Sequence, residues 1–163
     1  MFDYDLNTEP AKKALRDAMA QLDDMTPVYT DISEYLLDQR RQRFASGTDP
    51  DGKPWAPKTQ GTLDRYKRLG YGTLNRPLIG PSKALSRQIQ RIVSKDGVVI
   101  GSSLVYARTM QEGAAKGSFG SDVRGNPLPW ANIPARRWLD LSDEEELEIV
   151  AIVDEHLEEL IEQ

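Results

Sequence analysis

Few residues in this chain have both the type and the spacing that catalytic or metal-binding chemistry requires. The single histidine, His156, lies among Glu155, Glu158 and Glu159, and the angular spread of these side chains on a helix fits no ordinary metal site. The sequence contains no cysteine, no Gly-x-Ser-x-Gly motif, no Walker A motif and no GxGxxG motif. We therefore expect no enzymatic activity and no cofactor, and we interpret His156 as part of a solvated helix face.

Two further patterns resemble ligand sites only weakly. Asp49 and Asp51 are spaced like the start of a calcium loop, but the third carboxylate and the distal glutamate are missing and Pro50 intervenes. The simpler interpretation is a turn that anchors Trp55 onto the core. Residues 117–120, Gly-Ser-Phe-Gly, suit a nest of backbone N–H groups for an anion. From these patterns we expect no metal.

Length and composition predict one globular domain. A chain of 163 residues is long enough for a proper core, and 39% of its residues are hydrophobic and 29% charged. It has no run of about 18 apolar residues, so we expect no membrane span. Its acidic start lacks the apolar segment of a signal peptide. The lack of cysteine is compatible with a reducing cytoplasm. We expect residues 1–163 to form a single domain, with mobile loops at about 47–58 and 113–134.

Charge is distributed unevenly along the chain. Residues 1–39 carry 3 basic and 9 acidic side chains, residues 40–138 carry 18 and 6, and residues 139–163 carry none and 11. The net charges are −6, +12 and −11 within a total of −5. Three arrangements suit this pattern: the ends fold onto the middle, copies associate middle against end, or the middle contacts a polyanion. A plainer interpretation is that each charged run forms a solvated face.

The N-terminal part predicts two helices. Apolar residues at helical spacing mark residues 10–25, and Thr26-Pro27 then suits an N-cap followed by a first helical proline. The second helix should end at Gly47 after a basic last turn. The two helices form either a hairpin or one kinked rod. A short basic helix follows at 59–69, with Leu63, Tyr66 and Leu69 facing inward. The first helix should bury Ala11, Ala14, Leu15, Ala18, Leu22 and Met25, and the second Val28, Ile32, Tyr35, Leu36 and Phe44.

The middle of the chain predicts a β-hairpin between two short helical segments. Residues 88–94 alternate in polarity, Asp96-Gly97 is typical of a tight hairpin turn, and 98–100 are β-branched up to Gly101. A helix over 106–111 then ends at Gly113. The loop 113–134 that follows is long for a compact domain, which is typical of functional or disordered loops. Its aromatic residues either form a surface that orders on a partner, or Trp130 tucks into the domain.

The C-terminal part predicts one long acidic helix. Ser142 and Glu145 match a capping box, in which each side chain bonds the backbone N–H of the other residue. The fold class is therefore α+β: an N-terminal helical hairpin, a small antiparallel sheet built on the β-hairpin, a long loop and a C-terminal helix. We expect the buried stripe of that helix to be Leu147, Val150, Val153, Leu157, Leu160 and Ile161.

Several short motifs follow one another along the chain. They are Arg43-Phe44 with residues 49–55, residues 85–89, residues 98–102 with Tyr106-Ala107, residues 111–113, residues 133–139 and residues 141–143. The order of these motifs resembles the virion morphogenesis family of tailed bacteriophages, the Mu G-like and tail completion proteins of the head–tail joining region. The resemblance covers about residues 27–161. Lys83-Ala84, Met110 and Arg137-Trp138 depart from the usual residues of that family, which argues against a chemical role for the histidine that Met110 replaces.

The resemblance implies a non-enzymatic structural protein of virion assembly. Such a protein forms a ring at the head–tail junction or the top of the tail, as a tail completion protein, a tail terminator or a neck connector. The implied partners are further copies of itself, with a hexamer expected, the connector or stopper and tail tube proteins, and genomic DNA passing through the lumen without sequence-specific binding. No membrane is implied, and assembly takes place in the host cytoplasm.

The interface with other subunits should use exposed aromatic and basic residues. The alternative function, from a different class, is a nucleic-acid-binding module that uses the basic segment 40–138. The expected interface residues are Trp55, Arg65, Arg68, Phe119, Trp130, Arg136, Arg137 and Trp138.

Overall fold

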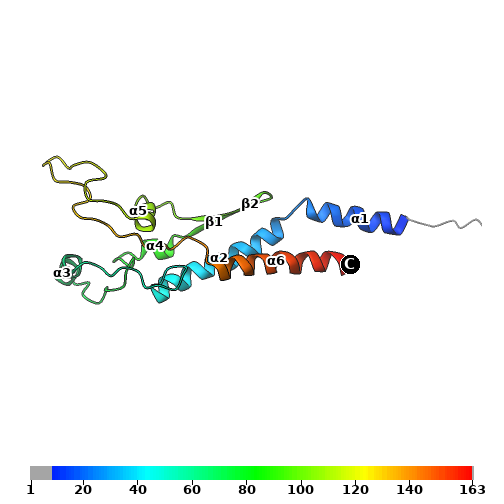
Figure 1. The fold of residues 1–163 in the computed structure, drawn as a ribbon, viewed down its shortest axis with the longest axis horizontal. Coiled ribbons are helices and arrows are strands. Elements are labelled where there is room, and N and C mark those ends of the chain that lie inside the picture. Colours follow the sequence, from blue (N-terminus) through cyan, green and yellow to red (C-terminus); the bar gives the residue numbers. More distant parts are fainter. Residues whose placement is uncertain (1–8, 163) are drawn as a thin grey trace, which may run out of the picture.

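The chain folds into an elongated α+β structure, with α3 at one end of the long axis and α1 at the other (Figure 1). The computed structural model describes residues 9–162. None of the helices in this part of the chain is both long and apolar enough to cross a membrane. In chain order the elements are α1 (Glu9–Leu22), α2 (Thr26–Ser46), α3 (Gln60–Arg68), α4 (Ala84–Arg87), β1 (Gln90–Ser94), β2 (Gly97–Gly101), α5 (Ala107–Glu112) and α6 (Asp143–Glu162).

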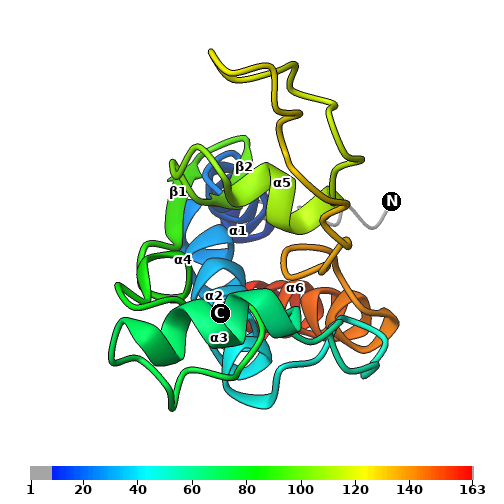
Figure 2. The same cartoon turned by 90° about the vertical axis from the view of Figure 1, so that its left-hand side faces the viewer.

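Helix α2 is the axis on which the other elements pack. Thr26 is its first helical residue and not its N-cap as the sequence predicted, because its backbone N–H donates to Asp24 Oδ1 at 3.1 Å. The helix ends at Gly47 as predicted, in a left-handed conformation with φ 80°. Helix α1 continues along the long axis beyond the start of α2, which corresponds to the kinked rod and not to the hairpin (Figures 1 and 2).

Two apolar clusters lie along α2. One surrounds its first half, where Ile100 of β2 and Ile149 and Ile152 of α6 pack against the buried residues Val28, Ile32 and Leu36. The other surrounds its end and confirms that Trp55 anchors the loop 48–57. The Phe44 ring lies 5.4 Å from the Trp55 ring, nearly edge to face. Its buried members are Phe44, Trp55, Leu85, Ala107 and Trp138.

The predicted β-hairpin is present and lies against α2. Its turn is Lys95-Asp96, one residue earlier than predicted, because Ser94 pairs with Gly97 in the antiparallel register. Arg91 joins the hairpin to α2 by donating to Ser33 Oγ and Glu34 Oε1, both at 2.9 Å. As predicted, the hairpin follows a short helical turn, α4, and leads to α5, which ends at Gly113.

Helix α6 begins with the predicted capping box but turns a different face to the core. Ser142 N–H donates to Glu145 Oε2 and Glu145 N–H donates to Ser142 Oγ, both at 3.2 Å. The predicted stripe is wrong at Leu147 and Val150, which are 71% and 55% exposed. The buried Glu145 fixes the helix phase, so Ile149 and Ile152 face α2 together with Val153, the predicted member that does pack there. The side chain of Ile161 lies outside the described residues.

The inward-facing residues predicted for α3 and α1 are right at some positions and wrong at others. In α3, Thr59 caps the first turn, and Leu63 and Tyr66 are half-buried, but Leu69 is 56% exposed because it follows the last helical residue. In α1, Leu22 is 46% exposed, and Met25 is half-buried after the helix has ended. The predicted positions Ala11, Ala14, Leu15 and Ala18 lie outside the side chains that the structure describes.

Candidate interaction surfaces

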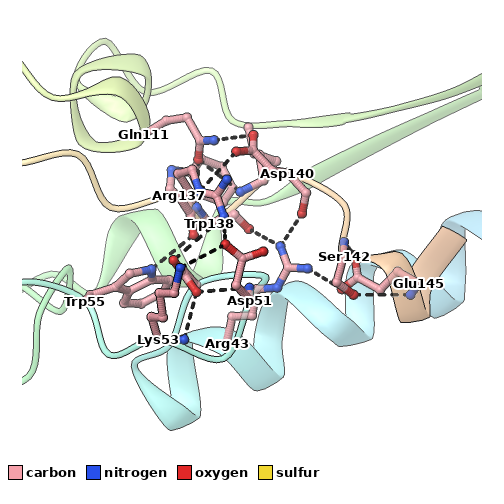
Figure 3. Close-up of polar contacts among 12 residues, drawn as sticks. Arg43, Asp51, Lys53, Trp55, Gln111, Arg137, Trp138, Asp140, Ser142 and Glu145 are labelled. Atoms are coloured by element: carbon pink, nitrogen blue, oxygen red, sulfur yellow. Dashed lines mark hydrogen bonds and ion pairs between the residues drawn. The ribbon is translucent and has the colours of Figure 1, made fainter.

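A buried ion cluster fixes the frame that carries the exposed surfaces. Arg40 Nη1 donates to Glu145 Oε2 at 2.9 Å, and Arg43 Nη2 donates to Glu145 Oε1 at 2.5 Å. Both arginines also donate to backbone carbonyls of residues 138–140. Burial and the charge of Arg40 lower the pKa of Arg43, while the Glu145 carboxylate opposes that shift. The cluster joins α2 to α6 and to residues 138–140, and the bonded residues are between 95 and 105 positions apart in the sequence (Figure 3).

Gln111 of α5 holds the same segment from the other side. Its Oε1 accepts from the N–H groups of Trp138 at 2.7 Å and Leu139 at 3.0 Å, and its Nε2 donates to Asp140 Oδ1 at 2.6 Å (Figure 3). Two residues on, Gly113 has φ 78°, and an added Cβ would lie 2.7 Å from Ile133 O. Only glycine fits there without a shift of the backbone. The base of the loop 113–134 is therefore fixed in place.

The loop 113–134 forms a projecting ribbon, by which we mean residues 114–133. Backbone hydrogen bonds join its two arms, including Ala114 with Ile133 in both directions and Phe119 N–H to Leu128 O at 2.7 Å. At the tip, the Asp122 carboxylate accepts from the N–H groups of residues 124 and 126, and hydrogen bonds from residues 126 and 124 lower the Asp122 pKa. The ribbon extends away from the body at the α3 end of the molecule (Figures 1 and 2).

Large apolar side chains are exposed along this ribbon. Phe119 is 60% exposed, Trp130 is 71% exposed and Val123 at the tip is fully exposed. Trp130 therefore does not tuck into the domain. Three such residues on one projecting segment are typical of a surface that contacts another molecule.

The eight predicted interface residues fall into three groups: buried, half-buried and exposed. Trp55, Arg136 and Trp138 are 5%, 8% and 0% exposed. They support the fold from inside and present no side-chain surface in the single chain, because aromatic stacking and backbone carbonyls hold them. Arg137 is half-buried. The exposed members are Arg65 and Arg68 of α3 and Phe119 and Trp130 of the ribbon.

Arg137 is paired within the chain, although its side chain retains contact with solvent. Its Nη2 donates to Asp51 Oδ2 at 2.7 Å, and Asp49 and Asp140 lie within 3.7 Å of the guanidinium (Figure 3). The Asp49 carboxylate also accepts from the N–H groups of Asp51 and Lys53. Asp49 and Asp51 thus close a turn and bind Arg137. Within residues 9–162, no cluster of three His, Asp or Glu side chains could hold a metal ion.

A cavity of about 530 Å³ lies beside the ribbon, and sequence reasoning did not predict it. It opens between α3, residues 78–85, α5 and residues 129–134. Lys58 and Arg136 are its charged lining residues, and no carboxylate from the described part of the chain lines it. Lys58 Nζ donates to Leu74 O and Ile79 O and lies 4.6 Å from the centre of the Tyr66 ring. Burial lowers the pKa of both cations, and Arg136 lowers that of Lys58 further.

Surface charge also separates along the long axis. Exposed basic residues lie on α3, including Arg65, Lys67 and Arg68, and none of these three forms an ion pair within the described part of the chain. The exposed acids of α6 extend towards α1 at the opposite end (Figure 1). The basic middle of the sequence is only partly basic surface, because Arg40, Arg43 and Arg136 are buried and others are paired.

Comparison with known proteins identifies the family. No curated protein and no solved structure matches the chain. The model of the phage virion morphogenesis family matches residues 6–158, nearly the whole length. This match includes α2, the hairpin, the ribbon and most of α6. The chain therefore belongs to the phage virion morphogenesis family, which is concerned with building bacteriophage particles.

Proposed function

We propose that the chain is a non-enzymatic structural protein that assembles into a ring at the head–tail junction or at the top of the tail. Within that position it would act as a tail completion protein, a tail terminator or a neck connector. Its partners would be neighbouring copies, the connector or stopper and tail tube proteins, and the DNA that passes through the lumen. The family match supports the role in virion assembly.

The observation that carries the ring proposal is the different character of the two ends. One end presents the ribbon, with Phe119 and Trp130 exposed, beside the basic α3. The acidic face of α6 carries the exposed Leu147 and Val150 in the first half of the helix, begins near the end of α2 and extends towards α1 at the other end (Figure 1). A contact between two different patches is heterologous, and it closes into a ring when the rotation between copies allows it.

Apolar residues must supply much of the affinity of this contact. An exposed ion pair contributes only about 0–1 kcal/mol, so the charges of α3 and α6 orient the copies more than they hold them. Large aromatic side chains at the centre of an interface contribute far more, often about 2 kcal/mol or more when truncated. We therefore assign the anchoring role to Phe119 and Trp130.

Sedimentation velocity of the purified full chain tests the proposal. The wild-type protein should give one oligomeric species at low salt, and Phe119→Ser with Trp130→Ser should shift it to the monomer. Ile92→Ser is the matched control, because Ile92 is 65% exposed on the hairpin and outside both patches. A wild-type protein that stays monomeric at tens of micromolar would contradict the proposal.

A DNA-binding experiment distinguishes the alternative function, a nucleic-acid-binding module, from the proposed one. Binding through several phosphates weakens steeply with salt, so filter binding of duplex DNA at two ionic strengths detects it. We expect weak binding at both, since three arginines of the basic segment are buried. Tight binding that collapses at higher salt, from a monomeric protein, would favour the nucleic-acid module instead.

A further inference from the structure

The cavity beside the ribbon contains two cations without an anionic partner. Neither Lys58 nor Arg136 forms an ion pair within the described residues. Both donate instead to neutral backbone carbonyls. A charge withdrawn from water is costly unless an opposite charge compensates it. A carboxylate entering this cavity would therefore gain more here than on an open surface.

The remaining walls of the cavity are largely apolar. Leu78, Ile79, Leu85, Met110 and Ile133 line it together with three prolines. Its volume of about 530 Å³ lies within the range of about 300–1,000 Å³ that is typical of ligand pockets. The lining thus favours a ligand that combines acidic and apolar side chains.

We propose that this cavity binds residues 1–8 of a second copy of the chain. This inference rests on the proposed head-to-tail assembly and names the segment that would enter the neighbour. The sequence Met-Phe-Asp-Tyr-Asp-Leu alternates apolar residues with Asp3 and Asp5. In an extended segment, alternate side chains point to opposite sides. The two aspartates would then face Lys58 and Arg136, and Phe2 and Tyr4 would face the apolar wall.

The acidic helix α6 is a poorer occupant than this segment. A helix with its side chains is about 10–12 Å across, whereas an extended segment can insert single side chains between α3 and the ribbon. The exposed acids of α6 also share the helix surface with the exposed Leu147 and Val150, and such a mixed surface suits contact with a flat partner surface. We therefore assign α6 to the outer contact and residues 1–8 to the cavity.

The segment must come from a second copy because of the length of the molecule. Helix α1, which begins at Glu9, lies at one end of the long axis, and α3 lies at the other (Figure 1). The cavity is lined by Thr62 and Tyr66 of α3. Helices of 14 and 21 residues lie between them and span about 20 and 30 Å. Eight extended residues reach at most about 28 Å. The segment therefore falls short of the cavity in its own chain.

Two full-length variants test the inference. The segment variant is Asp3→Asn with Asp5→Asn, which removes the carboxylates and keeps the shape. The cavity variant is Ala131→Glu, which adds a carboxylate to the lining of the cavity. Ala131 is exposed, so we expect the fold to tolerate the larger side chain. Each should raise the dissociation constant for self-association at least tenfold in sedimentation velocity. Ala131→Gln, of matched size, should raise it less than threefold.

A mixture of the two variants gives the sharpest readout. The intact segment of the cavity variant can enter the intact cavity of the segment variant, but no further copy can join through this contact. The mixture should therefore contain a heterodimer that neither variant forms alone.

The outcomes separate this inference from the proposed function. If the wild type assembles and the segment variant assembles equally well, the cavity inference is overturned while the ring proposal stands. If Ala131→Gln is as damaging as Ala131→Glu, recognition of the carboxylates by charge is overturned. A wild type that does not assemble at all contradicts the proposed function itself.

Discussion

Neutralising Glu145 should cost more stability than any other single loss of charge on α6. Its carboxylate faces Arg40 and Arg43, and all three residues are at least nine-tenths buried, with 3%, 2% and 6% exposure. In Glu145→Gln, two buried guanidinium groups face a neutral amide. Removing one partner of a buried ion pair costs about 3–5 kcal/mol. For a chain of this size, each kcal/mol lowers Tm by about 2–4 °C, so we expect a fall of roughly 6–20 °C.

Urea unfolding followed by tryptophan fluorescence measures this loss, since Trp55 and Trp138 are buried next to the cluster. All variants are compared at one protein concentration, because self-association adds apparent stability. Glu148→Gln is the matched control: it removes an exposed charge from the same helix and should change the free energy of unfolding by less than about 0.5 kcal/mol. A Glu145→Gln variant within about 1 kcal/mol of the wild type would refute the argument that this carboxylate holds α6 on α2.

Three further predictions follow from single positions. Gly113→Ala should lose about 1–3 kcal/mol or more in urea unfolding, because its Cβ would overlap Ile133 O. Gly117→Ala, at the same φ of 78° but with its nearest contact at 3.5 Å, should lose less, and equal losses would contradict the overlap argument. Leu147→Ser should leave the free energy of unfolding within about 0.5 kcal/mol of wild type and weaken assembly in sedimentation, because Leu147 is 71% exposed; a clear loss of stability would contradict that placement. Burial and the charge of Arg136 lower the pKa of Lys58 below its ordinary 10.5. As pH rises towards 10.5, the unfolded chain therefore binds more protons than the folded one, and the free energy of unfolding of the wild type should rise relative to that of Lys58→Met. A difference between the two proteins that does not change with pH would contradict this prediction.

Local signals predicted the elements, and long-range pairing decided which faces they bury. Gly47 and the Ser142–Glu145 box mark helix ends through backbone chemistry that involves only near neighbours, and both predictions are confirmed. The stripe of α6 was predicted from apolar residues alone. Glu145 overrides that pattern because two arginines about 100 residues away in sequence need its carboxylate.

A signal for this cluster does exist in the sequence of α2. Val28, Ile32, Leu36, Arg40 and Phe44 recur every four residues, so Arg40 lies on the buried face of the helix. A cation within an apolar stripe predicts a buried partner. The same reasoning does not reach Arg136 or the cavity, because their surroundings come from segments between residues 56 and 136 that only the fold brings together.

Reversing the charges of the two adjacent residues Arg136 and Arg137 would be a poor test of assembly. Arg136 donates to Ala56 O at 2.7 Å and to Pro57 O at 3.1 Å and is 8% exposed. Arg136→Glu combined with Arg137→Glu would therefore damage the fold and the surface together. Reversals at Arg65 and Arg68, which are exposed on α3, change the surface charge alone.

Electron microscopy of the assembled protein tests the central claim most directly. Negatively stained wild-type protein, purified at low salt, should show closed rings of one size with a central opening, and Phe119→Ser with Trp130→Ser should abolish them. Compact monomers, or open filaments without closed rings, would contradict the account of this chain as a ring-forming protein of the phage virion.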